Sequence, residues 1–100
     1  MSAHEIARSS ASVTTANAND YIIRLVKHFG HKVDVESEAG RATFRFSCGT
    51  ANLAARDGGL MIEIDAPDAG GRTETEEVVE SHLLRFAHRE ALGALHWTRT

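Results

Sequence analysis

The sequence predicts an α+β domain in which a mostly antiparallel sheet carries two helices packed on one face. Two stretches place apolar residues at helical spacing, and elsewhere apolar and polar residues alternate with a period of two. This alternation gives each strand one buried and one exposed face, which is typical of an antiparallel meander. Because the helices and the sheet must bury each other's apolar faces, we expect the order β-α-β-β-β-β-α-β.

The first third of the chain predicts a tail, a strand and a helix. Residues 1–9 are small and polar without a period, so we expect a flexible N-terminal tail ahead of a single domain over 10–100. Residues 10–15 alternate and predict a strand. Asn17 suits a helix N-cap, and Gly30 is expected to end that helix in the left-handed conformation. Between them lies one apolar stripe, Ile22, Leu25, Val26 and Phe29.

Four strands are expected next, over residues 33–36, 41–46, 51–55 and 60–66. Asp57-Gly58 between the last two is a strong two-residue hairpin signal.

The last third predicts a second helix and a short strand. Thr73-Glu74-Thr75-Glu76 reads as a capping box that opens the helix, with Gly70-Gly71 as a turn before it. Gly93 should end the helix or its trailing turn, and residues 94–98 should form the last strand. The helical stripe is Val78, Val79, Leu83 and Phe86.

The apolar faces predict one core. Truncating Phe46 or Phe86 to alanine is expected to cost on the order of 3–5 kcal/mol. The expected members are Leu25, Phe29, Phe44, Phe46, Leu53, Ile62, Ile64, Leu83 and Phe86.

Composition narrows the class of protein. A net charge of −3 argues against a dedicated nucleic-acid binder, which usually has a basic surplus. Cys48 is the only cysteine, so it has no internal disulfide partner and a reducing compartment is expected. No stretch approaches the ~18 apolar residues of a membrane span, and the N-terminus lacks a secretory pattern. We expect a cytoplasmic protein, monomer or homodimer, without membrane or nucleic-acid partners.

Two basic segments hold four of the six histidines, residues 27–32 and 82–90. Each lies at the end of a predicted helix, so we expect them to converge on one polar corner. His82 falls at the edge of the second helix's apolar stripe and should be largely buried. A buried imidazole needs hydrogen-bond partners for its nitrogens.

Three interpretations of this corner remain open. His28, His31 and His82 could bind a divalent metal such as zinc or iron, with Glu90 as a further ligand or outer partner. Alternatively, forked guanidinium groups could form a pocket for a small anion, a carboxylate or a phosphate. The third interpretation is structural, with histidines at helix ends and the arginines paired to Glu90 or to the acidic run 74–80. The ligand-binding set we expect is His28, His31, Lys32, His82, Arg85 and Arg89.

Catalytic motifs are weak in this chain. Cys48 has no matching base in its neighbourhood, and neither Ser47 nor Ser81 lies in a hydrolase elbow. We therefore favour binding over catalysis and leave the role of Cys48 open.

The chain resembles a bacterial family of proteins of about 100 residues, domain-of-unknown-function family 2218. The resemblance runs from Ser10 onward and implies a small α+β bacterial domain, loosely associated with iron-uptake gene neighbourhoods. An aldolase label that some members carry is not transferable, because 100 residues cannot form that kind of barrel. Ser47-Cys48 departs from the family pattern. The residues that carry the resemblance are Tyr21, His28-Phe29, His31-Lys32, Phe44, Phe46, Gly49, Leu53, Val79, His82-Leu83, Arg85-Phe86-Ala87, Arg89-Glu90 and Trp97.

The expected function is that of a ligand-binding or accessory module with a His/Arg-rich polar pocket, linked to iron metabolism. The alternatives are a structural homodimer that pairs an exposed sheet edge and a small metal-dependent enzyme. Solution mass and a panel of metals and anions would separate them.

Overall fold

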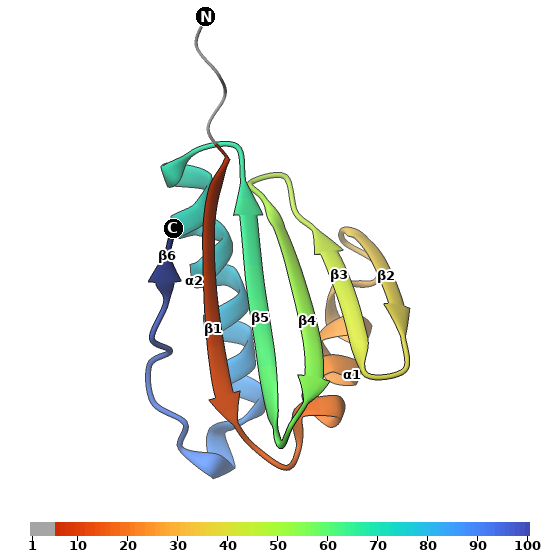
Figure 1. The fold of residues 1–100 in the computed structure, drawn as a ribbon. Coiled ribbons are helices and arrows are strands. Elements are labelled where there is room, and N and C mark those ends of the chain that lie inside the picture. The colour runs from red at the N-terminus through yellow and green to blue at the C-terminus, as the bar shows by residue number, and fades with distance from the viewer. Residues whose placement is uncertain (1–5) are drawn as a thin grey trace, which may run out of the picture.

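A computed structural model describes residues 6–100 and confirms the α+β fold class and the order of its elements. All six strands pair antiparallel in one sheet of order β2-β3-β4-β5-β1-β6, and both helices cover the same face (Figure 1). The elements are β1 Ala7–Thr14, α1 Ala18–Phe29, β2 Asp34–Glu38, β3 Arg41–Arg45, β4 Thr50–Arg56, β5 Gly59–Ala66, α2 Ala69–Phe86, a 3-10 turn η1 His88–Glu90, and β6 Thr98–Arg99.

The two ends of the chain extend the β2–β5 meander beyond β5. β1 pairs along its whole length with β5, placing Ala11 opposite Ile62, and β6 then pairs with β1 at Ser9 and Ser10. The Asp57-Gly58 hairpin between β4 and β5 is confirmed. Both residues have positive φ, 52° and 74°, as a type I′ turn requires.

The core lies between the sheet and the two helices and contains the expected aliphatic residues and Phe44, which is 1 % exposed. Phe46 and Phe86 are only partly buried and pack against the edge of this core. The cost of truncating either of them should therefore fall below the 3–5 kcal/mol expected for a fully buried phenylalanine.

Both ends of α1 differ from the sequence prediction. The Asn17 side chain makes no capping hydrogen bond; instead the Thr15 hydroxyl accepts from the Asn17 N–H at 3.0 Å. Gly30 has φ −58° and ψ −21°, so it is right-handed and its N–H continues the helical pattern to Val26 O. The turn runs on because Lys32 and Val33 both donate to Phe29 O, which satisfies that carbonyl without a left-handed residue.

α2 begins earlier than the capping-box prediction. Its N-cap is Asp68, whose side chain accepts from the Gly71 N–H at 2.7 Å, so Gly70 and Gly71 lie inside the first turn. A side chain at Gly71 would lie 2.4 Å from Cys48 O, which explains why this turn needs glycine. Thr75 is fully buried and bonds Gly71 O at 2.7 Å instead of opening the helix.

The terminal strands also differ in extent. β1 starts at Ala7, within the predicted tail, because residues 7–9 continue the pairing with β5; residues 1–5 of that tail lie outside the described residues. The last strand covers only residues 98–99, not 94–98. α2 ends at Phe86, and the positive φ values of Ala91 and Gly93 turn the following chain back along the sheet.

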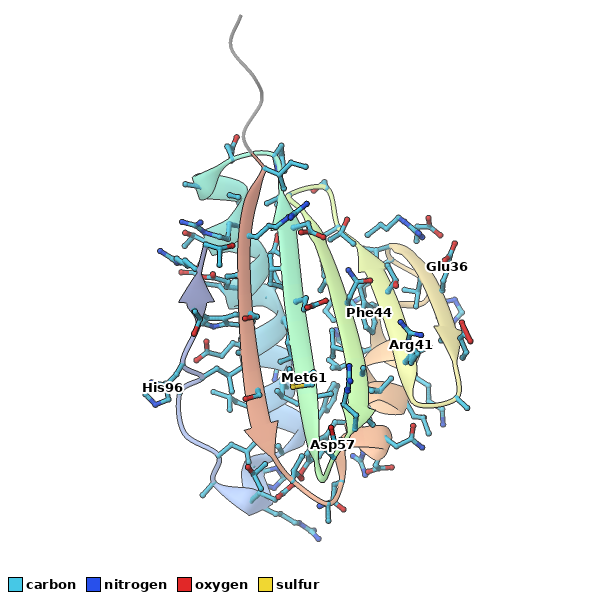
Figure 2. All side chains as sticks on the ribbon, in the orientation of Figure 1. Glu36, Arg41, Phe44, Asp57, Met61 and His96 are labelled. Atoms are coloured by element: carbon cyan, nitrogen blue, oxygen red, sulfur yellow. The ribbon has the colours of Figure 1, made fainter. Side chains whose placement is uncertain are left out.

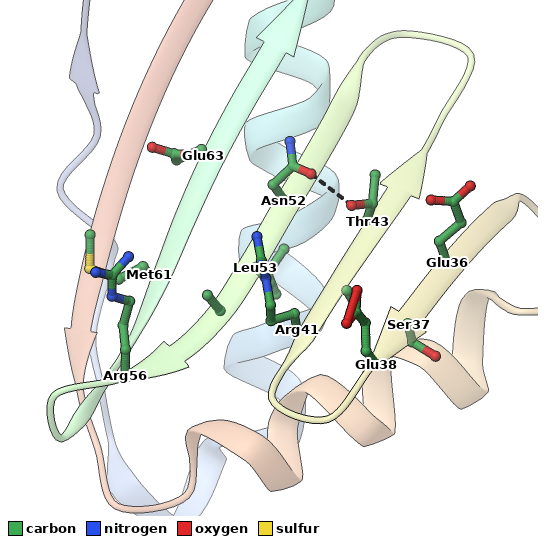
Figure 3. Close-up of a pocket in the computed structure, with 12 residues that line it drawn as sticks. Glu36, Ser37, Glu38, Arg41, Thr43, Asn52, Leu53, Arg56, Met61 and Glu63 are labelled. Carbon is green, nitrogen blue, oxygen red and sulfur yellow. Dashed lines mark hydrogen bonds between the residues drawn. The ribbon is translucent and has the colours of Figure 1, made fainter.

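No helix within residues 6–100 covers the other face of the sheet, which is polar (Figures 1 and 2). Arg8 pairs there with Asp65 at 3.1 Å, and Arg45 pairs with Asp34 and Glu36 at 3.3 Å each. A shallow hollow of about 310 Å³ opens on this face and is lined by residues of β2, β3, β4 and β5 (Figure 3).

Within residues 6–100 no helix is both long enough and apolar enough to cross a membrane.

Candidate functional site

The two expected histidine segments do meet, through His28 and His82. His28 lies in the last turn of α1 and His82 one turn before the end of α2, and their ring centroids are 4.7 Å apart. Helical spacing explains this position: His82 follows Val78 and precedes Phe86 by four residues each, at the margin of the buried face. Both imidazoles are half-buried, so His82 is less buried than the sequence predicted.

Phenylalanine rings surround the pair. Phe29, which is 6 % exposed, lies 4.8 Å from both imidazole centroids, and Phe86 lies 6.0 Å from His28. We call the group His28, Phe29, His82 and Phe86, with Lys32 and Arg85 at its rim, the histidine corner. Phe29 joins it to the core through edge contacts with Phe44 and Phe46.

One nitrogen of His82 is committed to the backbone. Its Nδ1 lies 2.7 Å from Val78 O, and since a carbonyl only accepts, Nδ1 carries a hydrogen. A neutral His82 therefore presents Nε2 as an acceptor or a metal ligand, whereas a protonated His82 presents a second N–H donor. The chemistry available at this corner therefore depends on the protonation of His82.

Positive charge dominates the surroundings of His28. Partial burial is the main cause of a lowered pKa for His28, and the charges of Lys32, His82 and Arg85 lower it further. None of the charges that shift this pKa is a carboxylate. Neither Lys32 nor Arg85 forms an ion pair with any of residues 6–100. The corner is thus an unneutralised basic site.

Neither His31 nor Arg89 makes a polar contact with His28 or His82 within residues 6–100. Both are exposed, and neither is among the groups that act on the pKa of His28. No three His, Cys, Asp or Glu side chains within residues 6–100 are grouped as metal ligands, so the expected set of His28, His31 and His82 is not assembled. Helix geometry accounts for His31, because it follows the end of α1 in the turn toward β2.

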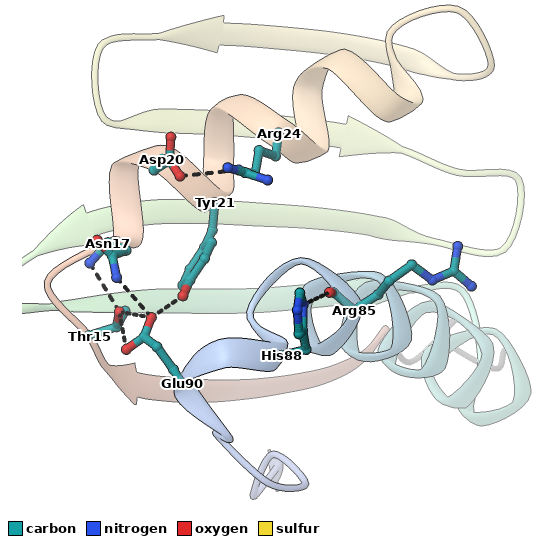
Figure 4. A network of polar contacts seen from close by, with 8 residues as sticks. All are labelled: Thr15, Asn17, Asp20, Tyr21, Arg24, Arg85, His88 and Glu90. Carbon is teal, nitrogen blue, oxygen red and sulfur yellow. Dashed lines mark hydrogen bonds and ion pairs between the residues drawn. The ribbon is translucent and has the colours of Figure 1, made fainter.

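Glu90 is part of a different network, which lies at the start of α1 (Figure 4), whereas His28 lies in the last turn of that helix. Its carboxylate accepts from the Thr15 hydroxyl at 2.7 Å, from Asn17 Nδ2 at 3.1 Å, and from the Tyr21 hydroxyl. These bonds, led by that of Tyr21, lower the pKa of Glu90, while burial and the bond to Glu90 raise the pKa of Tyr21. We call these four residues the Glu90 network. The network holds η1 against the start of α1 through these hydrogen bonds. Glu90 is therefore not a ligand beside the histidines.

The acidic run of α2 binds the C-terminal segment, not the arginines at its own end. Glu80 accepts from Trp97 Nε1 at 2.8 Å and from the Leu95 N–H at 3.2 Å. Glu76 is buried and pairs with Arg99 at 2.6 Å; the Arg99 bond and charge outweigh burial and lower the pKa of Glu76. The predicted pairing of Arg85 or Arg89 with this run or with Glu90 is therefore wrong.

Cys48 lies in the turn between β3 and β4, against α2. Its Sγ is 3.2 Å from the Thr75 hydroxyl, and the residue is half-buried. Helix α2 approaches closely here, since a side chain at Gly49 would lie 2.5 Å from Thr75 Oγ1. Packing is a sufficient reason for a small residue at this position.

The geometry thus defines a small α+β domain with a basic, aromatic corner between the ends of its two helices. The family described as "Uncharacterized protein conserved in bacteria (DUF2218)" matches residues 10–98, and the chain belongs to this family. It is also similar to PA4090 from Pseudomonas aeruginosa, solved by NMR, with 33% sequence identity and a TM-score of 0.77. That similarity covers 91% of this chain and 94% of PA4090. A comparison with curated proteins gave no match.

Proposed function

We propose that the protein is a ligand-binding or accessory module that captures a small anion, a carboxylate or a phosphate, at the histidine corner. The observation that carries this proposal is the contact between two half-buried imidazoles, with Lys32 and Arg85 as the other charges that act on His28. Forked and ammonium donors from Arg85 and Lys32 would supply charge-assisted hydrogen bonds. The aromatic rings around the imidazoles lower the local polarity and strengthen such bonds.

The charge around the histidine corner also favours an anion over a metal ion as the ligand. A divalent cation at His28 and His82 would have two imidazoles as ligands and two unpaired cations beside it, which repel it. Among residues 6–100 no third ligating side chain joins the pair. A link to iron metabolism is therefore proposed through an anionic chelator of iron, such as a polycarboxylate, and not through a bare ion or a metal-dependent reaction.

The two ligand types have opposite pH dependence. An anion is favoured when His28 is protonated, and the pKa of His28 is lowered from 6.5, so the affinity for an anion should rise as the pH falls from 6.5 toward that lowered pKa. A metal needs neutral imidazoles, so its affinity should fall over the same range.

Thermal shift with phosphate, citrate, ferric citrate, Zn²⁺ and Fe²⁺, each at pH 6 and pH 8, tests the proposal. We expect stabilisation by phosphate and citrate, larger at the lower pH, and loss of that effect in Arg85→Gln and His82→Gln. Arg89→Gln is the matched control, because Arg89 is an exposed arginine outside the corner. Stabilisation by metals alone, or equal effects in all variants, would overturn the anion site.

The homodimer alternative depends on the exposed edge of β2. Its carboxylates Asp34, Glu36 and Glu38 alternate along five residues, so two such edges would bring like charges together. We therefore propose a monomer, and the solution mass checks it.

A further inference from the structure

The open face of the sheet holds a second feature that is independent of the histidine corner. The hollow of about 310 Å³ (Figure 3) is lined in part by Ala54, whose side chain is shorter than those of its cross-strand neighbours. Register places Arg41 and Met61 on either side of Ala54 across the sheet. Met61 is 38 % exposed, so Ala54 and Met61 form a small apolar floor in a polar face.

Two arginines stand at one end of this floor. Arg41 is the cross-strand neighbour of Ala54, and Arg56 lies two residues further along β4 on the same face. Arg41 forms no hydrogen bond or ion pair with residues 6–100, and Arg56 has only a 4.0 Å contact with the highly exposed Asp57. By contrast, Arg8 and Arg45 on the same face are paired at 3.1 and 3.3 Å. Of the arginines on this face, Arg41 and Arg56 are therefore the two without a close ion pair within residues 6–100.

A carboxylate stands at the other end. Glu63 follows Met61 by two residues on β5 and lines the hollow. Asp65, further along β5, is paired with Arg8, and Glu36, across the hollow on β2, is paired with Arg45, whereas Glu63 has no ion pair with any of residues 6–100. Glu38, the register partner of Arg41, also lines the hollow without an ion pair among these residues. The Asn52 amide lies beside Glu63, held by the Thr43 hydroxyl at 2.7 Å. One end of the hollow thus carries two guanidinium groups with Glu38 beside them, and the other end carries the carboxylate of Glu63.

We propose that this hollow binds a small dipolar ligand, an ω-amino carboxylate. Its carboxylate would bond Arg41 and Arg56, its methylenes would lie on Ala54 and Met61, and its ammonium group would pair with Glu63. Glu63 lies two strands across and two residues along from Arg41, about 12 Å between Cα atoms, so the flexible Arg41 and Glu63 side chains and head groups separated by four or five methylenes together span this distance. A hollow of this volume is at the lower end of the range for small-molecule sites.

The probe is 6-aminohexanoate, titrated into ¹⁵N-labelled protein while amide chemical shifts are followed. We expect millimolar binding, with shifts over residues 52–63 and none at His28 or His82. Hexanoate and 1-aminohexane each lack one charged end, so each should bind about tenfold more weakly, the size of one charge-assisted contact.

Variants of the open face assign the two ends. Arg41→Gln should weaken 6-aminohexanoate and hexanoate but not 1-aminohexane. Glu63→Gln should weaken 6-aminohexanoate and 1-aminohexane but not hexanoate. Arg45→Gln is the matched control, since Arg45 is on the same strand and already paired. Ala54→Leu should fill the hollow and abolish binding of all three. Absence of localised shifts, or 6-aminohexanoate binding to Ala54→Leu as to wild type, would overturn the proposal.

Discussion

The histidine corner and the Glu90 network occupy opposite ends of α1, and each contains titratable side chains from both halves of the chain. In the Glu90 network each of the four side chains is hydrogen-bonded to another residue of the chain, and Glu90 alone accepts from three side chains. In the histidine corner only one imidazole nitrogen has a backbone partner, and the neighbouring charges repel one another. The comparison distinguishes a network whose hydrogen bonds stabilise the fold from a corner whose donors we propose to bind a ligand.

Phe29 is the residue whose loss would damage the histidine corner most. Phe29→Ala removes a ring that is 6 % exposed and contacts both imidazoles, Phe44 and Phe46. We expect a loss of about 3–5 kcal/mol in the free energy of unfolding, measured by urea denaturation. Phe86→Ala is the matched comparison and should cost clearly less, because Phe86 is only partly buried. Equal losses would show that the aromatic contacts of the corner do not depend on Phe29.

Tyr21→Phe tests the Glu90 network without changing its packing. Tyr21 is 5 % exposed, and its hydroxyl is hydrogen-bonded to a carboxylate. Its removal should lower the free energy of unfolding by about 1–2 kcal/mol. The thermal shift produced by phosphate or citrate should not change, because the histidine corner remains intact. A variant that lost both stability and the anion response would show that the two regions are coupled.

Arg85→Gln should have the reverse effect. Arg85 is exposed and forms no ion pair with residues 6–100, so the melting temperature without ligand should stay near that of wild type. Citrate affinity, measured by calorimetry, should fall about tenfold through loss of one charge-assisted contact. Lys32→Gln should weaken binding in the same direction. A fully retained affinity in both variants would remove the anion assignment.

Acid should destabilise the two regions in different pH ranges. The pKa of His28 is lowered from 6.5, so the folded state favours the neutral ring; its stabilising contribution is complete above pH 6.5 and is lost as the pH falls toward the lowered pKa. The pKa of Glu90 is lowered from 4.5, so its contribution is complete above pH 4.5 and is lost as the pH falls through the lowered value. Urea denaturation across this range should show both losses, with His28→Gln removing only the first and Glu90→Gln only the second. If both variants removed the same pH-dependent loss of stability, the account of two separate regions would be contradicted.

Much of the fold could be predicted because its signals are local. Alternation in the strands, the stripe of α1 and the Asp57-Gly58 turn each depend on residues within a few positions of one another. The start of α2 was missed because Gly70-Gly71 suggests a turn, whereas their role depends on the close approach of Cys48. A glycine pair in the first helical turn behind an aspartate N-cap was the available signal.

The candidate site was predicted only in part, for a similar reason. The proximity of His28 and His82 follows from two helix ends on one face of the sheet, which the pattern indicates. The partners of Glu90 lie 69 to 75 residues away along the chain, and that of Glu80 lies 17 residues away at Trp97. Periodicity carries no information about such long-range pairings. The sequence therefore could not show that Glu90 and Glu80 bind other partners, and that Arg85 and Arg89 form no ion pair within residues 6–100.

The imidazole resonances of His28 measure the central claim directly. A pH titration of ¹⁵N-labelled protein, with and without citrate, reports the pKa of His28 in the free and bound states. A bound anion stabilises the protonated ring, so we predict a pKa below 6.5 in the free protein and a clear rise with citrate, reduced in Arg85→Gln. An unchanged pKa of His28 at saturating citrate would contradict an anion site at the histidine corner.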